Sequence, residues 1–183
     1  KEQSLFFSLV RISGRIYKKK HKEHDYGLFF ASKTLAEFFY YIGFPNGNRT
    51  DQEFLLPEWI VNGTPEIKSN FLAGFYDAEG SSCPDRSAKK ARWRIYINQH
   101  KHIDLKYNGI IFMNQLRTFL SSFHIQSTSI HISKGNIRQT GVETIRLSFQ
   151  IESDLKNFFT FVGFSNPLKQ QKLIKALHDT KAI

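Results

Sequence analysis

The chain has 183 residues, of which 40% are hydrophobic and 15% aromatic. This length and composition predict one folded domain or two packed halves, and they exclude a disordered tail. The formal net charge of +10 attracts polyanions, and because no apolar run reaches spanning length, nucleic acid is favoured over membrane as the partner.

Cysteine content bears on compartment and metal type. The single cysteine, Cys83, excludes an intramolecular disulfide and a multi-cysteine zinc site. The first residues lack both a Met and the pattern of a signal peptide. We therefore expect an intracellular protein, cytoplasmic in a prokaryote or organellar in a mitochondrion or chloroplast.

The N-terminal part contains a segment that recurs later in the chain. A basic strand at 14–20 and a second strand at 27–32 precede the helical segment 34–49, "TLAEFFYYIGFPNGNR". Shifted by 120 residues, this segment matches "DLKNFFTFVGFSNPLK" at 154–169, and Arg49 falls on Lys169. The spacing of Leu, Phe, Phe, Gly, Phe and Asn is identical, which indicates an internal repeat.

The two copies of this repeat differ in completeness. Similar strand pairs precede both helical segments, but the motif at 72–80 has no counterpart, since subtracting 120 falls before residue 1. We therefore predict an incomplete first half-repeat at residues 1–60. A complete second half-repeat should occupy residues 61–183.

The second half alternates helices and strands, which predicts an α+β fold with helices on one side of a sheet. The expected elements are helix 65–78, a loop or strand at 81–91, strand 92–99, helix 108–122, strands 127–133 and 143–150, and helices 153–162 and 167–178.

The helix at 65–78 has recognisable ends. Thr64, Pro65 and Glu66 supply an N-cap, a first-turn proline and an early acid, and Gly80 is a suitable C-cap. Hydrophobic residues recur at helical spacing between them, so we expect a buried helix.

Two acids lie at the end of this helix, where the helix dipole is already negative. At this helix end, Asp77 and Glu79 each destabilise the helix by roughly 0.3–1 kcal/mol unless a cation or a hydrogen-bond donor lies next to them. A hard divalent cation with oxygen ligands would offset their charge. The alternative is that both are ordinary solvated acids at a helix end.

The stretch "LAGFYDAEG" resembles the motif that names the LAGLIDADG homing endonucleases. The identical positions are Leu72, Ala73, Gly74, Asp77, Ala78 and Gly80. Glu79 replaces the last Asp of the motif, and the preceding segment at 56–71 resembles the approach to the second motif of two-motif members.

This resemblance implies a fold of αββαββα-type units with a curved antiparallel DNA-binding sheet. Two motif helices would pack together through small residues. The residues that we expect in that helix interface are Leu72, Ala73, Gly74 and Ala78.

The resemblance also implies a hydrolytic site. Glu79 would bind Mg²⁺ or Mn²⁺ at the scissile phosphate, and Asp77 would position the helix end and rank second as a metal ligand. Gln99 would orient the attacking water, and Lys169 would bring a basic group to the catalytic site. Phosphodiester hydrolysis needs an activated water and a stabilised leaving oxygen, which metal ions bridged by carboxylates provide.

Alternation along the predicted strands separates a core face from a polar face. On the core face of the strand at 92–99 lie Trp93, Ile95 and Ile97. The residues predicted to contact DNA are Ser81, Ser82, Arg92, Arg94, Tyr96, Asn98, Ser129, His131, Ser133, Arg146, Ser148, Arg15, Tyr17 and Lys19. The alternative is a merely solvated sheet face.

The sequence thus predicts a site-specific double-strand DNA endonuclease encoded in an intron or an intein. The alternative is an RNA maturase or a non-catalytic nucleic-acid-binding protein of the same family. Each catalytic site should need a second motif helix, from a homodimer, a partner chain or a preceding segment.

Overall fold

The computed structural model describes residues 12–18, 26–84, 92–126, 128–133 and 141–180. The chain divides into two compact units, residues 1–42 and 43–183. Each unit is described by itself. This division differs from the predicted half-repeat boundary at residue 60, which concerns the sequence repeat and stays a prediction.

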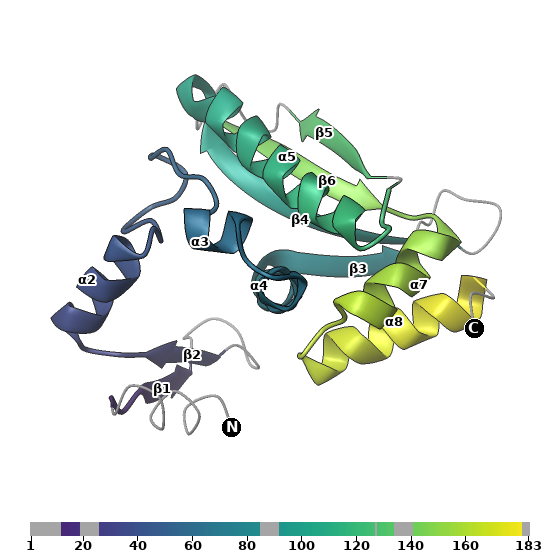
Figure 1. The fold of residues 1–183 in the computed structure, drawn as a ribbon, viewed down its shortest axis with the longest axis horizontal. Coiled ribbons are helices and arrows are strands. Elements are labelled where there is room, and N and C mark those ends of the chain that lie inside the picture. The colour runs from purple at the N-terminus through teal and green to yellow at the C-terminus, as the bar shows by residue number, and fades with distance from the viewer. Residues whose placement is uncertain (1–11, 19–25, 85–91, 127, 134–140, 181–183) are drawn as a thin grey trace. The chain divides into compact units, whose positions relative to one another are not determined.

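The first unit contains a two-stranded antiparallel sheet followed by a helix (Figure 1). Strand β1, Arg15–Lys18, pairs with β2, Tyr26–Phe29. Helix α2, Lys33–Tyr41, begins at Ser32, whose hydroxyl accepts from the Leu35 N–H at 3.2 Å. This strand, strand, helix order confirms the prediction for this part of the chain.

The second unit is built on a four-stranded antiparallel sheet in the order β3, β4, β6, β5. The strands are β3 Gly80–Pro84, β4 Trp93–His102, β5 Ser129–Ser133 and β6 Val142–Phe149. The helices are α3 Glu58–Val61, α4 Pro65–Glu79, α5 Lys106–Ser122, α7 Glu152–Phe161 and α8 Pro167–Thr180, with a 3-10 turn η1 at Ile103–Leu105. The predicted α+β class is confirmed.

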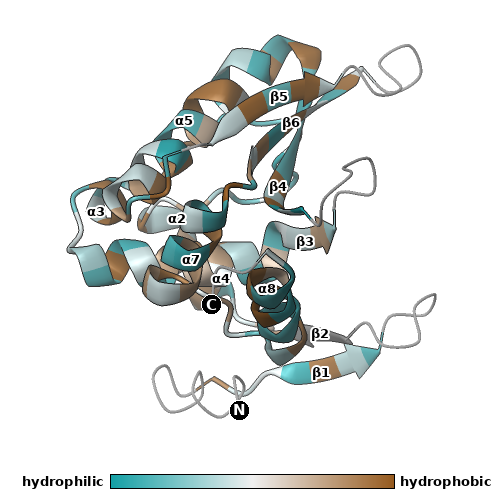
Figure 2. Ribbon diagram, turned by 90° about the vertical axis from the view of Figure 1, so that its right-hand side faces the viewer, coloured by the Kyte–Doolittle hydropathy of each residue, from teal (hydrophilic) through white to brown (hydrophobic). Residues whose placement is uncertain are grey.

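The core of the second unit lies between the sheet and its helices. Helix α5 packs on β4 and β6, and α8 packs on β3. Hydrophobic residues recur between more hydrophilic ones on β5 and β6 (Figure 2). The inward-facing side chains on β4 and β6 are buried, namely Trp93, Ile95, Ile97, Ile145 and Leu147. The helices cover this face of the sheet. Because side chains alternate along a strand, the residues that lie between these buried positions point to the opposite face.

The repeat leaves a structural signature at the ends of two helices. The Ile42 N–H donates to the Phe38 carbonyl, and the Val162 N–H donates to the Phe158 carbonyl, each at 3.0 Å. The glycine that follows in each copy has positive φ, +96° at Gly43 and +66° at Gly163. Only glycine adopts this conformation at little cost, which explains why it recurs in both copies.

Within the described ranges, no helix combines the length and the apolar content that crossing a bilayer requires. This finding agrees with the absence of a long apolar run in the sequence.

Candidate active site and nucleic-acid interface

Helix α4 runs directly into strand β3, and this junction carries the two acids of the motif. The helix begins as predicted, with the Thr64 hydroxyl accepting from the Ile67 N–H. Gly80 ends it in an extended conformation, with φ of −80°. A Cβ at Gly80 would lie 2.5 Å from the Tyr76 carbonyl oxygen, so close backbone approach requires the glycine here.

Two basic side chains of the protein lie at the C-terminal end of α4 and offset its negative charge. The Lys169 ammonium donates to the carbonyls of Tyr76, Asp77 and Gly80 at 3.1, 2.6 and 2.6 Å. The Arg49 guanidinium forms an ion pair with Glu79. These two basic residues are the mates in the sequence repeat, and both reach the same helix end.

Lys169 therefore lies where the sequence places it, at the tip of the motif helix. Burial lowers its pKa, and the nearby charges of Asp77 and Glu79 oppose this effect. Its three carbonyl partners engage the ammonium as a cap on α4. A direct catalytic role for Lys169 stays a prediction.

Asp77 is engaged in the start of α8. Its carboxylate accepts from the backbone N–H of Ser165 at 3.0 Å and from that of Asn166 at 3.1 Å. These bonds occupy both carboxylate oxygens, because Ser165 donates to Oδ2 and Asn166 to Oδ1. The geometry favours the positioning role of Asp77 over the predicted metal-binding role.

We expect the substitution Asp77→Ala to lower the free energy of unfolding by about 1–2 kcal/mol, because it leaves two N–H groups before α8 without their acceptor. Urea denaturation measures this change. Asp104→Ala removes an exposed carboxylate whose ion-pair partner among the described residues is His102, and it should shift the value by less than about 0.5 kcal/mol. Equal effects of the two substitutions would contradict the capping role.

Glu79 lines a cavity of about 230 Å³ beside strand β4. Its polar lining includes Arg49, Asn98, Gln99 and His100. Both amide atoms of Gln99 are buried and have no hydrogen-bond partner among the described residues. Buried amide groups without a hydrogen-bond partner in the protein are usually hydrogen-bonded to a water or bound to an ion. The structure thus brings Glu79 and Gln99 to one cavity, whose lining also includes Phe54, Phe75 and Phe112.

The segment that carries Arg49 is held by a buried lysine. Lys101, fully buried on the core face of β4, donates to the Arg49 carbonyl at 2.9 Å and to the Gln52 carbonyl. Its ammonium lies 4.2 Å from the centre of the Phe54 ring. Burial lowers the pKa of Lys101. The sequence reasoning missed Lys101, although a lysine at an inward-facing strand position is a detectable signal.

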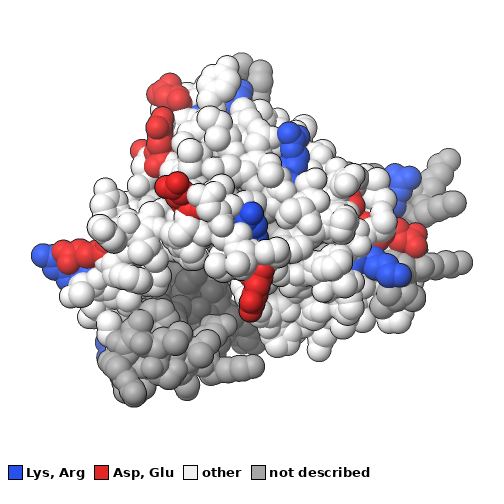
Figure 3. All heavy atoms as spheres, in the orientation of Figure 1, with Lys and Arg blue, Asp and Glu red and all other residues white. Residues whose placement is uncertain are grey.

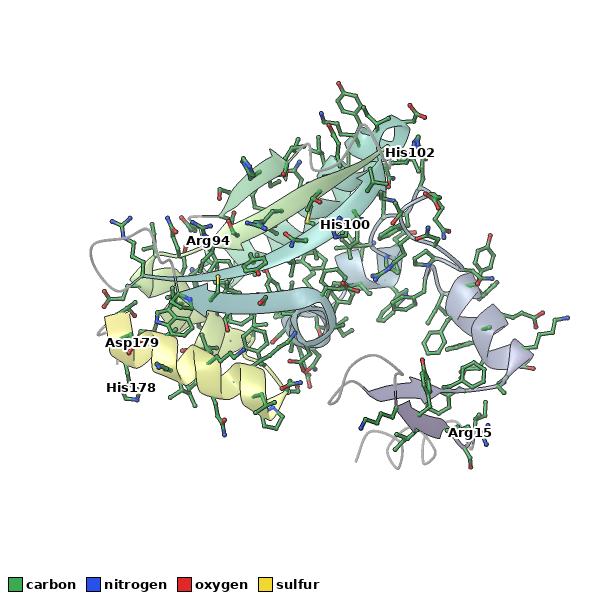
Figure 4. All side chains as sticks on the ribbon, turned by 180° about the vertical axis from the view of Figure 1, so that it is seen from behind. Arg15, Arg94, His100, His102, His178 and Asp179 are labelled. Atoms are coloured by element: carbon green, nitrogen blue, oxygen red, sulfur yellow. The ribbon has the colours of Figure 1, made fainter. Side chains whose placement is uncertain are left out.

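The opposite face of the sheet carries the predicted DNA-contacting side chains in cross-strand rows. Directly opposite residues share a face. One row is Ser81, Tyr96, Ser148 and Ser129, the next is Asn98, Arg146 and His131, and the third is His100, Thr144 and Ser133. Figure 4 shows Arg94 and His100 on β4, on the side of the sheet away from α5. The predicted alternation on β4, β5 and β6 is confirmed.

Two predicted site positions are buried away from this polar face, and a third falls on a residue that the structure does not describe. Ser82 lies opposite Ile95 and is buried, 7% exposed. Its side chain therefore points to the core face of the sheet, and the prediction that it contacts DNA was wrong. Leu72 is fully buried in the core of its own unit, so it is not an interface residue. Lys19 lies outside the described residues.

Ser148 lies on the polar face but is buried, 8% exposed, so its predicted contact with DNA is not supported, whereas the following predicted positions are accessible. Arg92 is exposed just before β4, and Arg15 and Tyr17 are exposed on β1 in the first unit. On α4, Gly74 and Ala78 are exposed and Ala73 is half-buried. A Cβ on Gly74 would have no described atom within 4 Å. This part of the helix surface can therefore accept a closely packed neighbour.

Charge on the second unit is not uniform. On the side that carries α5, acidic and basic side chains are interspersed (Figure 3). The polar sheet face holds Arg94 and Arg146, and it lies across the sheet from that side. Among the described residues, no group of three or more His, Cys, Asp or Glu side chains could hold a metal ion.

Comparisons with known proteins link the chain to parts of larger proteins. It is 32% identical over 142 residues to the tRNA-splicing ligase RtcB of Methanocaldococcus jannaschii, a match that covers 76% of this chain and 14% of the relative. The tRNA-splicing ligase RtcB of Pyrococcus furiosus is 29% identical over 143 residues, covering 78% and 14%. The chain thus spans about one seventh of these relatives. No family model matches it.

A protein with a different name shares the same region. The DNA-directed RNA polymerase subunit Rpo1N of M. jannaschii is 22% identical over 171 residues, covering 88% of this chain and 12% of the subunit. Among solved structures, the LAGLIDADG homing endonuclease I-GzeII in complex with its DNA target matches at 16% identity with a TM-score of 0.39. That match covers 84% of this chain and 46% of the endonuclease.

Proposed function

We propose that this chain is a site-specific, metal-dependent double-strand DNA endonuclease of the LAGLIDADG homing type. The observation that carries the proposal is the continuity between the Glu79 cavity and the polar sheet face. Asn98 and His100 belong to both, since they line the cavity and lie in the cross-strand rows of that face. A duplex lying along the rows would therefore bring its backbone to Glu79.

The pattern of relatives supports a mobile element. The chain is similar over 142 residues to part of a tRNA-splicing ligase and over 171 residues to part of an RNA polymerase subunit, and the matches cover only 14% and 12% of these relatives. A segment shared by proteins with such different names is expected for an insert that acts independently of its host. Among the two origins expected from the sequence, this favours the endonuclease part of an intein.

The residues around Glu79 fit one half of a divalent-metal site. The Glu79 carboxylate and the Gln99 amide, which has no hydrogen-bond partner in the described part of the chain, offer oxygen donors of the kind that Mg²⁺ and Mn²⁺ prefer. A bound ion would supply Lewis-acid stabilisation and a more acidic water. The remaining donors would come from a second motif helix, docked against the Gly74 and Ala78 surface of α4.

The residues of the chain would then have distinct tasks. Gln99 would orient the attacking water through its amide. Arg49 would exchange its ion pair with Glu79 for contact with the scissile phosphate. Lys169 and Asp77 would keep the helix end and α8 in place through their backbone hydrogen bonds.

A second candidate function is RNA binding without cleavage, favoured by relatives named as tRNA-splicing ligases. The chain corresponds to a small part of those ligases, so their activity is not assigned to it.

The proposal predicts that affinity for duplex DNA falls steeply with salt. Each neutralised phosphate should contribute about −0.9 to the slope of log affinity against log salt concentration. Fluorescence anisotropy with KCl between 50 and 300 mM measures this slope, and plasmid cleavage with Mg²⁺ tests the activity. A flat dependence would argue against DNA as the partner. Tighter binding to structured RNA without cleavage would favour the second candidate.

A further inference from the structure

Three side chains on the polar sheet face form one connected unit. Arg146 on β6 lies directly opposite Asn98 on β4, and its Nε–H donates to the Asn98 Oδ1 at 2.9 Å. The guanidinium carbon of Arg146 lies 4.7 Å from the centre of the Tyr96 ring. The guanidinium plane is therefore held at its edge by an amide and at its face by an aromatic ring.

Of these three residues, Arg146 lines a hollow on the polar face. The hollow has a volume of about 500 Å³, and its lining includes Arg94, Ser129, His131, Arg146 and Ser148. His131 on β5 is the cross-strand neighbour of Arg146 on the side away from Asn98. The hydrogen bond to Asn98 involves only Nε of Arg146, so the two terminal nitrogens of the guanidinium do not take part in it.

Two parallel N–H donors select one base edge in the major groove. Guanine presents two acceptors there, O6 and N7, whereas adenine presents one acceptor and one donor. An arginine has donors only, so it matches guanine and meets a donor clash at adenine. Holding the side chain in advance reduces the ordering cost of this contact on binding, which favours a base reader over a flexible phosphate contact.

We propose that Arg146 determines specificity for a guanine in the bound duplex, with Tyr96 and Asn98 as its positioning residues. The inference rests on the proposed DNA binding. The sequence predicts that Tyr96 and Asn98 contact DNA; the inference assigns them a positioning role, because the amide oxygen of Asn98 already accepts from Arg146.

Selection of bound sequences from a random duplex library tests the proposal. The wild-type protein should select a site with a guanine favoured by about tenfold to a hundredfold at one position. Arg146→Gln should remove that preference or move it to adenine, and Arg146→Lys should weaken it while keeping the salt dependence of affinity. Arg94→Gln removes the same charge from the same face and should leave this position unchanged while altering another.

The positioning residues need a readout that a structural defect would not mimic. Tyr96→Leu and Asn98→Ala should each reduce the preference for guanine at the Arg146 position. Neither should have a further effect there when combined with Arg146→Gln. Circular dichroism confirms that the variants are folded.

Each other result overturns a defined part of the inference. If Arg146→Gln reduces the salt slope by about 0.9 and leaves every base preference intact, Arg146 contacts a phosphate and the proposal fails. If Asn98→Ala changes a separate adenine position, Asn98 is a reader in its own right. If the wild-type protein selects no DNA at all, the proposed function fails, and the inference fails with it.

Discussion

The substitution Glu79→Gln should lower the rate of Mg²⁺-dependent DNA cleavage by about a hundredfold to a thousandfold or more. Glutamine keeps the size of the side chain and removes the negative charge that would hold a divalent cation at the scissile phosphate. Glu79 is the carboxylate at the tip of α4 that lines the cavity of about 230 Å³ beside β4. Single-turnover cleavage of a plasmid, in the form of the protein that cuts DNA, measures the loss.

A matched control separates this effect from a general loss of charge. Glu66→Gln makes the same substitution at the other end of the same helix, where Glu66 is exposed. We expect this variant to cut at the wild-type rate. DNA affinity of Glu79→Gln should be retained, because the substitution removes a negative charge from a protein that binds a polyanion. Equal cleavage rates in wild type and Glu79→Gln would remove Glu79 from the metal-binding role.

The substitution Lys101→Met should lower the free energy of unfolding by about 3 kcal/mol. Methionine fills most of the volume of the lysine stem, but it leaves the carbonyls of Arg49 and Gln52 without their buried, charged donor. For a chain of this size, such a loss corresponds to a decrease in Tm of roughly 6–12 °C. Differential scanning calorimetry measures it. Lys156→Met, at an exposed position on α7, should change the free energy by less than about 0.5 kcal/mol.

The same lysine predicts a pH dependence with a defined sign. Burial lowers the pKa of Lys101 below its ordinary value of 10.5, so the unfolded chain binds more protons between the lowered pKa and 10.5. Stability contributed by this group therefore rises with pH over that window. The difference in unfolding free energy between wild type and Lys101→Met should widen as pH increases toward 10.5. A difference that narrows would show that the pKa of Lys101 is raised in the folded state.

Local patterns in the sequence predicted the elements of the fold closely. The caps at Thr64 and Gly80 placed α4 within one residue of its observed end, because helix ends depend on neighbouring backbone groups. Strand alternation separated Trp93, Ile95 and Ile97 from Arg94 and Tyr96, because side chains on a strand alternate between faces. The start of β3 has no such alternation of hydrophobic and polar residues, and there the prediction for Ser82 was wrong.

The partners of the acids could not be predicted from local patterns. Arg49 reaches Glu79 across 30 residues of sequence, and Asp77 reaches Ser165 across 88. These pairs depend on how the segments pack in the second unit. The charge argument at the end of α4 predicted a cation or a donor there and pointed to a divalent metal, whereas the structure shows Arg49 and Lys169, and the metal stays a prediction. Which cations they are follows only from the tertiary structure.

The motif also placed Leu72 incorrectly, for a related reason. A motif read as a linear string assigns all of its small and apolar residues to one surface. On the folded helix, Leu72 points into the core of its own unit, while Gly74 and Ala78 are exposed. The helical period of 3.6 residues separates these positions, since Leu72 and Gly74 differ by about 200° around the axis.

Iron-directed cleavage tests most directly the claim that Glu79 holds a divalent cation against DNA. Fe²⁺ in place of Mg²⁺, with added hydrogen peroxide as oxidant and ascorbate to reduce Fe³⁺ again, generates hydroxyl radicals that cut the DNA backbone next to the bound ion. With duplexes selected by the wild-type protein, we predict cuts confined to a few adjacent nucleotides. These cuts should disappear in Glu79→Gln, although that variant still binds the duplex. Cuts of equal position and intensity in the variant, or none with the wild-type protein, would contradict the account.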